Sequence, residues 1–186
     1  MKRLVTITVG KTHSGKSTFA RALEEQLPNA LVIDQDNHAA FINTHYRALL
    51  PPTGPNTTKY AVTEATVNCA VHPTDLDLIL CNANRSRSNR LTLLTKFRNL
   101  GFTSVLVHFD ISDTVLAARV ADTERSTIIF RTASSFKEVL DRQRAESVKE
   151  DNAAPLKSEA DHYFSVVSSE EVSRTVRDVV SLKRSL

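Results

Sequence analysis

The stretch Gly10-Lys-Thr-His-Ser-Gly-Lys-Ser17 constrains this chain more than any other part of its sequence. It fits the pattern G-x-x-x-x-G-K-[ST]. The β-branched run at residues 4–9 precedes it and has the length of a strand, and the apolar residues after Gly15 recur at helical spacing until Pro28. A strand, a glycine-containing loop and a helix in this order predict a phosphate-binding loop, or Walker A motif.

Each residue type in this loop has a chemical reason. The glycines let the backbone curl so that successive N–H groups point at phosphate oxygens, and the start of the helix adds the positive end of its dipole. We expect Lys16 to reach the β- and γ-phosphates as a catalytic group and the Ser17 hydroxyl to bind Mg²⁺. For His13 the main chain, and not the side chain, would do this work. The sequence therefore predicts ATP and Mg²⁺ as cofactors, with a nucleotide site formed by Gly10, Thr12, His13, Ser14, Gly15, Lys16, Ser17 and Thr18.

The strands expected in the rest of the chain are apolar throughout and alternate with helical segments. Such strands are typical of a parallel sheet that helices cover on both faces. With 41% hydrophobic residues and a net charge of +3, the composition excludes a disordered chain. We predict a single α/β domain with the three-layer α/β/α fold of P-loop NTPases and a five-stranded parallel sheet, whose strands lie near residues 4–9, 30–33, 76–81, 103–109 and 162–167.

Two further features bear on the environment of the protein and its class. No apolar run reaches the roughly 20 residues that a membrane span needs. Two cysteines are too few for a disulfide scaffold, so we expect Cys69 and Cys81 to be reduced core residues of a cytoplasmic protein. The Asn-Lys-x-Asp and Asp-x-x-Gly motifs of GTPases are absent, and the chain is short for a motor ATPase. A compact phosphotransferase remains.

Beyond the phosphate loop, the sequence resembles the P-loop kinases related to the kinase domain of phage-type polynucleotide 5′-kinase, which are AAA-type, zeta-toxin-like small kinases. The resemblance covers roughly residues 4–145 and rests on Ile33-Asp-Gln-Asp-Asn37, on Ile79-Leu-Cys-Asn-Ala-Asn84 and on a late arginine-containing segment. It implies a helical lid near residues 119–135 and an acceptor-side helical insertion near residues 37–72.

The resemblance also implies a reaction. The protein would transfer the γ-phosphate of ATP to a hydroxyl group, with a polynucleotide 5′-hydroxyl as the favoured acceptor and a nucleic acid as a partner. A nucleoside, nucleotide, sugar or antibiotic as acceptor is one alternative, and a non-catalytic ATP-binding module is another. A pI near 9.0 favours nucleic acid only slightly.

By the same resemblance, Asp36 would be the general base that takes the proton of the attacking hydroxyl. Its position just after a strand agrees, because ligands bind at the carboxyl edge of such sheets. The alternative is that Asp36 caps the following helix, and the two roles are compatible. Asp34 is a competing candidate for the base and is the residue that we expect beside Ser17 at the metal.

The lid would supply arginines to the charge that develops on the γ-phosphate. The resemblance makes Arg125 and Arg119 catalytic, with Arg131 behind them. Arg119 also shares a helical face with Val115 and Leu116 and could simply extend along that face to solvent.

The acceptor would meet Asp36, His38, Arg85 and Arg90. The arginines could instead belong to a basic loop that leads into a helix, and His38 could be a plain surface residue. Phe41 and Tyr46 could stack on a base or lie in the core. Asn82 departs from the family pattern, which has an aspartate at the end of this strand, so the metal site loses one negative charge.

Overall fold

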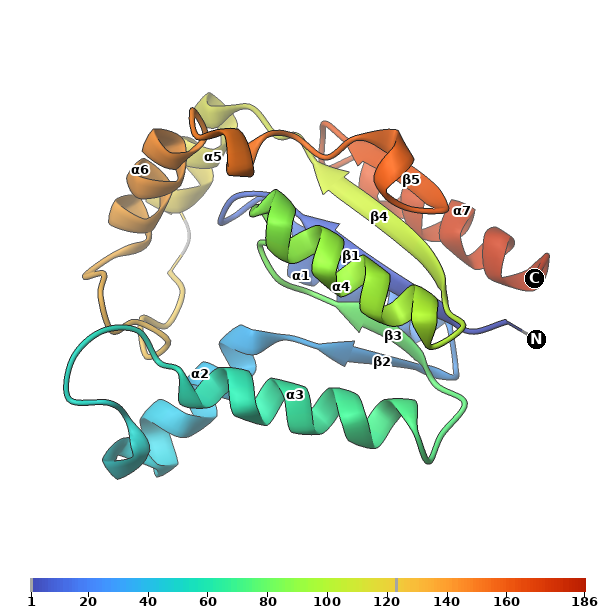
Figure 1. Cartoon of the computed structure of the whole chain (residues 1–186). Coiled ribbons are helices and arrows are strands. Elements are labelled where there is room, and N and C mark those ends of the chain that lie inside the picture. The colour runs from blue at the N-terminus through green and yellow to red at the C-terminus, as the bar shows by residue number, and fades with distance from the viewer. Residues whose placement is uncertain (1, 123) are drawn as a thin grey trace.

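The computed structural model of the protein describes residues 2–122 and 124–186. Five parallel strands form one sheet in the order β2-β3-β1-β4-β5 (Figure 1). The predicted α/β architecture is thereby confirmed. The strands are β1 (Leu4–Val9), β2 (Ala30–Ile33), β3 (Asp77–Leu80), β4 (Thr103–Phe109) and β5 (His162–Val166).

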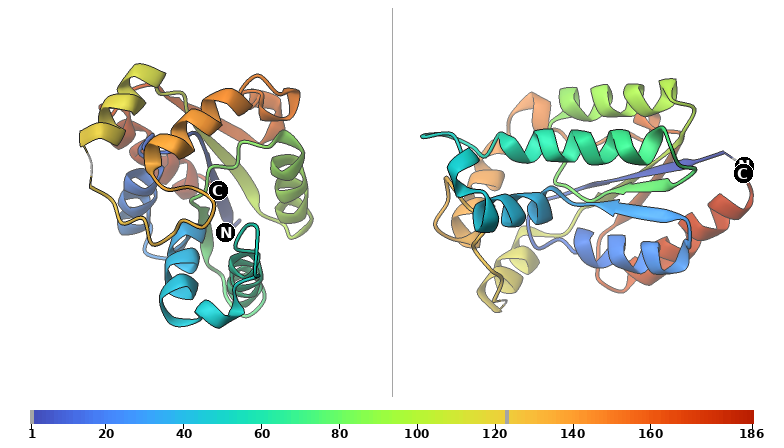
Figure 2. Two further views of the ribbon diagram at one scale, coloured as in Figure 1. Left: turned by 90° about the vertical axis from the view of Figure 1, so that its left-hand side faces the viewer. Right: turned by 90° about the horizontal axis from the view of Figure 1, so that it is seen from below.

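Helices cover both faces of the sheet, as continuously apolar strands require. On one face lie α1 (Lys16–Gln26) and α7 (Glu171–Arg184), and on the other lie α3 (Thr58–Val71) and α4 (Arg87–Asn99) (Figure 2, right). A separate cluster of buried apolar residues fills each layer. The first cluster contains Phe19 and Val176, and the second contains Val67 and Phe97.

The central strand β1 sets the position of the phosphate loop. Ile7 pairs with Leu80 of β3 and with Leu106 of β4, so these three strands end close to one another. The buried Thr8 hydroxyl donates to the carbonyl oxygens of Leu80 and Asn82, at 3.3 and 3.0 Å. The loop after β1 and the residues after β3 are therefore neighbours at the carboxyl edge of the sheet.

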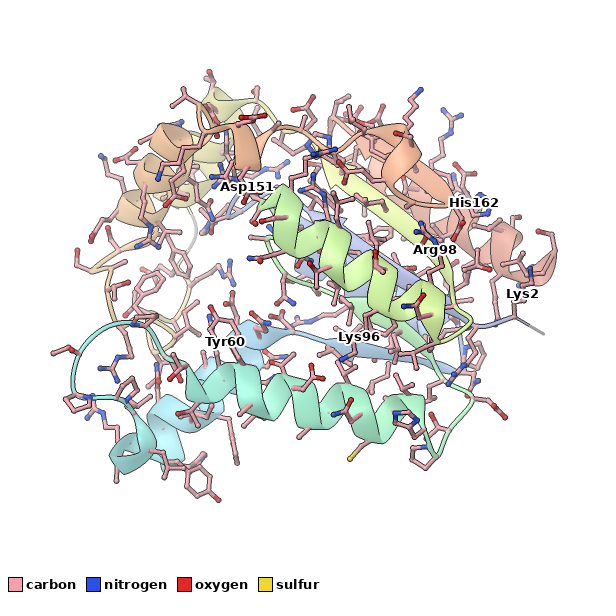
Figure 3. The ribbon with its side chains drawn as sticks, in the orientation of Figure 1. Lys2, Tyr60, Lys96, Arg98, Asp151 and His162 are labelled. Carbon is pink, nitrogen blue, oxygen red and sulfur yellow. The ribbon has the colours of Figure 1, made fainter. Side chains whose placement is uncertain are left out.

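Polar contacts also fix the outer helices. The Nζ atom of Lys96 on α4 donates to Glu64 of α3 at 2.6 Å. A carboxylate oxygen of Asp151 accepts from the main-chain N–H of Ser88 at 2.8 Å, and Figure 3 shows Asp151 at the amino end of α4.

Among the described residues, no helix is both long and apolar enough to cross a membrane. Cys81 is buried as predicted, but Cys69 is exposed, so the prediction of a core position for Cys69 was wrong.

The acceptor-side segment, predicted to be helical, contains two α-helices with a short 3-10 helix between them. Helix α2 (Gln35–His45) ends before Tyr46, whose φ of −131° and ψ of 43° leave the helical region. A 3-10 helix, η1 (Arg47–Leu49), follows it, and α3 completes the segment.

The predicted helical lid is helical only at its borders. Its first residues belong to α5 (Asp113–Asp122), residues 124–135 form no helix, and α6 (Phe136–Glu146) follows. Two further 3-10 helices, η2 (Glu150–Asn152) and η3 (Lys157–Glu159), lead to β5.

The lid segment, residues 124–135, touches the acceptor-side segment through two hydrogen bonds. The Asn43 side chain donates to the Ile128 carbonyl oxygen at 2.6 Å. The Arg131 guanidinium donates to the Pro51 carbonyl oxygen, also at 2.6 Å. Residues far apart in sequence thus meet beside the carboxyl edge of the sheet (Figure 1).

Candidate active site

The phosphate loop runs from the end of β1 to the first turn of α1. At Gly10 a side chain has no room, since a Cβ atom would lie 2.9 Å from the Cβ of Phe109 and 3.0 Å from the Ser14 hydroxyl. Gly15 has a φ of 99° and is the N-cap of α1, a conformation that glycine adopts without strain. The N–H of Gly10 donates to the Ala83 carbonyl oxygen at 3.0 Å and ties the loop to the end of β3.

Lys16 folds back over its own loop. Its Nζ atom donates to the Lys11 carbonyl oxygen at 2.5 Å and to the Ser14 hydroxyl at 3.2 Å. Burial lowers the pKa of Lys16 to about 8, against the attraction of the Asp36 and Asp34 carboxylates. A phosphate group placed in the loop would supply the negative charge that this ammonium group lacks.

The Ser17 hydroxyl faces a thiol. The Cys81 Sγ atom lies 3.6 Å from the Ser17 Oγ atom, and burial together with Asp34 raises the pKa of this thiol to about 11. Cys81 is therefore neutral. Asn82, which stands where the family pattern has an aspartate, accepts a hydrogen bond from the Gln35 N–H at 3.0 Å and joins the end of β3 to the start of α2.

The two carboxylates after β2 have different surroundings. Asp34 caps α2 by accepting from the Asp36 N–H at 2.9 Å, so the capping role considered for Asp36 belongs to Asp34. Burial raises the pKa of Asp34. Asp36 lies in the first turn of α2 with its side chain 52% exposed, and its Oδ2 atom is 4.0 Å from an Nη atom of Arg125.

The three lid arginines reach three different partners. Arg125 faces Asp36 and lies over the ring of Phe136, 4.8 Å from its centroid. Arg119 donates to the His13 carbonyl oxygen at 2.9 Å and to the Ser169 hydroxyl at 2.7 Å, so it holds the phosphate loop instead of only extending to solvent. Arg131 joins the lid to the acceptor-side segment.

His38 lies between α2 and α3. Its Nδ1 atom is 2.8 Å from the Thr63 hydroxyl, which donates its own proton to the Lys59 carbonyl oxygen. Nδ1 is therefore the donor in this contact, and Nε2 of the neutral ring carries the lone pair. Burial lowers the pKa of His38, although Asp34 opposes the shift.

The structure corrects the placement of Arg90. Its side chain is fully buried and forms a two-pronged ion pair with Glu159, at 2.7 and 3.1 Å. Its remaining nitrogen donates to the carbonyl oxygens of Asn84 and Arg85. A guanidinium group so engaged cannot contact an acceptor.

Arg85 is also engaged, but with α6. It donates to the Gln143 carbonyl oxygen at 2.6 Å and to the Ser147 hydroxyl at 2.9 Å, and it lies 3.6 Å from Glu146. The alternative, that these two arginines belong to a basic segment that leads into a helix, fits their contacts better than a role in acceptor binding does.

Three residues at the site escaped sequence reasoning. Cys81 faces Ser17, Phe136 carries Arg125, and Gln143 accepts a hydrogen bond from the Thr12 N–H at 2.7 Å. Only the helical spacing of Phe136 and Gln143, seven positions apart, could have indicated that both face the same way.

The site therefore combines a curled loop of main-chain amides, a lysine, a serine hydroxyl, a half-exposed carboxylate and a lid arginine. Among the described residues, no group of three or more His, Cys, Asp or Glu side chains could hold a metal ion alone. A magnesium site here would need oxygen atoms from a bound phosphate group, which is how Mg²⁺ commonly binds in such sites.

Comparison with known proteins shows the family of the chain. A family model described as an AAA domain matches residues 5–147, which is more than half of the chain. Comparison with curated proteins gives no match.

Solved structures share the fold at low sequence identity. APS kinase CysC of Mycobacterium tuberculosis, in complex with AMPPNP and APS, is 15% identical with a TM-score of 0.61, over 98% of both chains. Kti12 of Chaetomium thermophilum, in complex with ADP-AlF3, is 14% identical with a TM-score of 0.62, over 94% of this chain and 96% of that one. A sugar kinase from Janibacter sp. is 15% identical with a TM-score of 0.58, over 97% and 94%.

Proposed function

The chain belongs to the AAA domain family, and we propose that it acts as an ATP-dependent kinase that phosphorylates a hydroxyl group. The observation that carries the proposal is the pair formed by Asp36 and Arg125, 4.0 Å apart, next to the phosphate loop. A carboxylate and a lid arginine at this place are the two groups that phosphoryl transfer needs besides a triphosphate site. The fold shared with APS kinase and with a sugar kinase supports the same reaction class.

In this mechanism the acceptor hydroxyl lies at Asp36. The carboxylate takes the hydroxyl proton while the hydroxyl oxygen forms a bond to the γ-phosphorus, and the bond from that phosphorus to the β–γ bridging oxygen breaks. ADP leaves with the bridging oxygen. Lys16 and Arg125 balance the charge that spreads over the transferred oxygens, and Arg119 holds the loop through the His13 carbonyl oxygen.

Magnesium fits this site only together with a nucleotide. The Ser17 hydroxyl and Asp34 would hold the ion, which would neutralise charge on the β- and γ-phosphates. The neutral Cys81 thiol next to Ser17 contributes no charge, so the protein offers fewer negative ligands than an aspartate at that position would.

For the acceptor we favour a compact hydroxyl compound. The hydrogen bonds of Asn43 to Ile128 and of Arg131 to Pro51 draw the lid segment onto the acceptor-side segment. Arg85 and Arg90, the arginines expected along a nucleic acid strand, are engaged inside the protein. A small molecule needs no open groove and no such arginines.

A polynucleotide 5′-hydroxyl remains the second candidate because of a group of exposed aromatic rings. Phe41 is 50% exposed and Tyr46 is 48% exposed, and their ring centroids are 5.3 Å apart. The Lys59 ammonium group lies 5.2 Å from the ring centroid of Tyr60, which is also exposed. Aromatic rings beside a cation are a platform on which single-stranded bases stack.

The test is transfer of label from γ-labelled ATP to two sets of acceptors, hydroxyl-bearing small molecules and a 5′-hydroxyl oligonucleotide. We expect label in a small molecule. Asp36→Asn should lower transfer by about 10²- to 10⁴-fold, the usual contribution of a general base, and leave ATP binding intact. Asn37→Ala, an exposed neighbour in the same helical turn, is the matched control. Undiminished transfer by Asp36→Asn would refute the role of Asp36, and label in neither acceptor set would refute the kinase.

A further inference from the structure

One face of α6 contacts the phosphate loop at two consecutive residues. Phe136 and Gln143 are seven positions apart, two helical turns, and so point the same way, with the buried Leu140 between them. The Phe136 ring meets the His13 ring edge-on, with centroids 4.8 Å apart. The Gln143 Oε1 atom accepts a hydrogen bond from the Thr12 N–H at 2.7 Å.

The same Phe136 ring supports the lid arginine. The Arg125 guanidinium lies 4.8 Å from the ring centroid, and Phe130 of the lid segment packs on the ring from another side, with centroids 4.6 Å apart. Phe136 is buried under these groups. It therefore contacts both the phosphate loop and the arginine that faces Asp36.

The start and end of α6 are both fixed. At its start the Ser135 hydroxyl accepts from the Glu138 N–H, and the Glu138 carboxylate accepts from the Ser134 N–H. At its end Arg85 holds the Gln143 carbonyl oxygen and the Ser147 hydroxyl. These contacts hold the face of α6 that carries Phe136 and Gln143 in place beside the phosphate loop.

The His13 ring is suited to this contact because it is uncharged. Burial, and then the nearby Arg125, Lys16 and Arg119, lower its pKa to about 4. Its Nε2 atom is buried, and among the described residues it has no hydrogen-bond partner. The ring thus packs against Phe136 without adding another positive charge beside the lid arginine.

We infer that Phe136 and Gln143 are positioning residues: Phe136 aligns Arg125, and Gln143 fixes the main chain of the phosphate loop at Thr12, so that both lie correctly against the γ-phosphate of the bound nucleotide. The inference rests on the proposed function, which places a triphosphate in the loop and Arg125 over its last phosphate. Beyond that function, one face of α6 positions the groups that contact the γ-phosphate. ATP and ADP differ only in that phosphate, so the two residues should control the preference for ATP over ADP.

The experiment measures the dissociation constants of ATP and ADP for the wild type, Phe136→Leu and Gln143→Met. Both substitutions keep an apolar or isosteric bulk while removing the ring or the acceptor atom. We expect the preference for ATP over ADP to fall about tenfold in each variant, which is the value of one such contact, with ADP affinity within about twofold of the wild type. A purely structural role would weaken both nucleotides equally.

Arg142→Ala is the matched control, because Arg142 is exposed on α6 and next to Gln143 in sequence. It should keep the wild-type preference. A wild type without preference for ATP, or an unchanged preference in both variants, overturns the inference. The transfer assay separates this failure from that of the proposed function. A reduced preference in a protein that phosphorylates no acceptor supports the inference and refutes the kinase, and the reverse result refutes the inference alone.

Discussion

The phosphate loop and the acceptor side of the site are built in different ways. The loop occupies one short stretch of sequence between β1 and α1, and distant segments only hold it from outside, through Arg119 and Gln143. The acceptor side combines Asp36 from α2 with Arg125 from the lid segment, 89 positions later, and both side chains are partly exposed. The loop is thus formed before any ligand binds, whereas the acceptor side depends on contacts between distant segments.

This difference bears on energy as well as on geometry. The conformational entropy of a preformed loop is already lost during folding. A phosphate group therefore binds to donors that are already aligned. The contact between Asp36 and Arg125 is at the limit of an ion pair and is open to solvent, where such pairs contribute little. We expect that the acceptor side gains its final geometry only when substrates bind.

The largest predicted effect tests whether Arg90 stabilises the fold instead of binding the acceptor. Arg90→Ala should lower the free energy of unfolding by about 3–5 kcal/mol, because the buried Glu159 carboxylate loses both hydrogen bonds from Arg90 and keeps the guanidinium group of Arg87 only at 3.8 Å. Urea unfolding measures this loss. Replacing both residues, by Arg90→Met with Glu159→Gln, should cost less than Arg90→Ala alone.

Arg125→Ala is the comparison variant, because Arg125 is partly exposed and pairs with an exposed carboxylate. It should change stability by less than about 1 kcal/mol while lowering transfer. An unchanged free energy of unfolding in Arg90→Ala would contradict the structural role of Arg90 and would again make it a candidate for acceptor binding.

The contrast between Arg90 and Arg125 shows how much of the site the sequence could predict. The phosphate loop was predictable because its function depends on the spacing of neighbouring residues. The sheet was predictable because strands buried on both faces are apolar throughout. Whether an arginine is buried against a glutamate 69 positions away depends on tertiary packing, and no local pattern reports it.

Cys81 and Asn82 illustrate a second limit. Successive side chains at the end of a strand point to opposite faces, so a shift of one residue decides which of them faces Ser17. The family pattern has its metal-site aspartate at the position of Asn82, and in the structure Cys81 faces the Ser17 hydroxyl while Asn82 bonds to α2. The alignment follows from the pairing of β3 with β1, which is a property of the sheet as a whole.

A smaller but still large effect tests the preformed loop. Lys16→Ala should lower phosphoryl transfer by about 10²- to 10³-fold, the usual effect of removing one group that stabilises the transition state, and should weaken ATP binding. Initial-rate kinetics and calorimetry measure the two effects. Lys11→Ala is a suitable control, because the Lys11 ammonium group pairs with Asp113 on α5 and only its carbonyl oxygen serves Lys16. Equal losses in the two variants would contradict a specific role of Lys16.

The smallest effect is a pH dependence that separates the loop from the acceptor side. In the ligand-free protein burial lowers the pKa of Lys16 to about 8, below its ordinary value, and a bound phosphate favours the charged lysine. Above pH 8 the nucleotide must therefore bind together with a proton, and ATP affinity should fall by up to about tenfold between pH 8 and pH 9. Phosphate groups titrate near pH 6, outside this window.

The same shift makes the ligand-free protein more stable as the pH rises from 8 toward the ordinary pKa of lysine, because the unfolded chain holds the proton there and the native protein does not. Calorimetry in two buffers of different ionisation enthalpy measures the proton taken up on ATP binding. Lys16→Arg, which stays charged, should bind ATP without this uptake. If the wild type and Lys16→Arg showed the same pH dependence, the lysine of the empty loop would already be fully charged, and the pH dependence would have to arise from groups outside the loop.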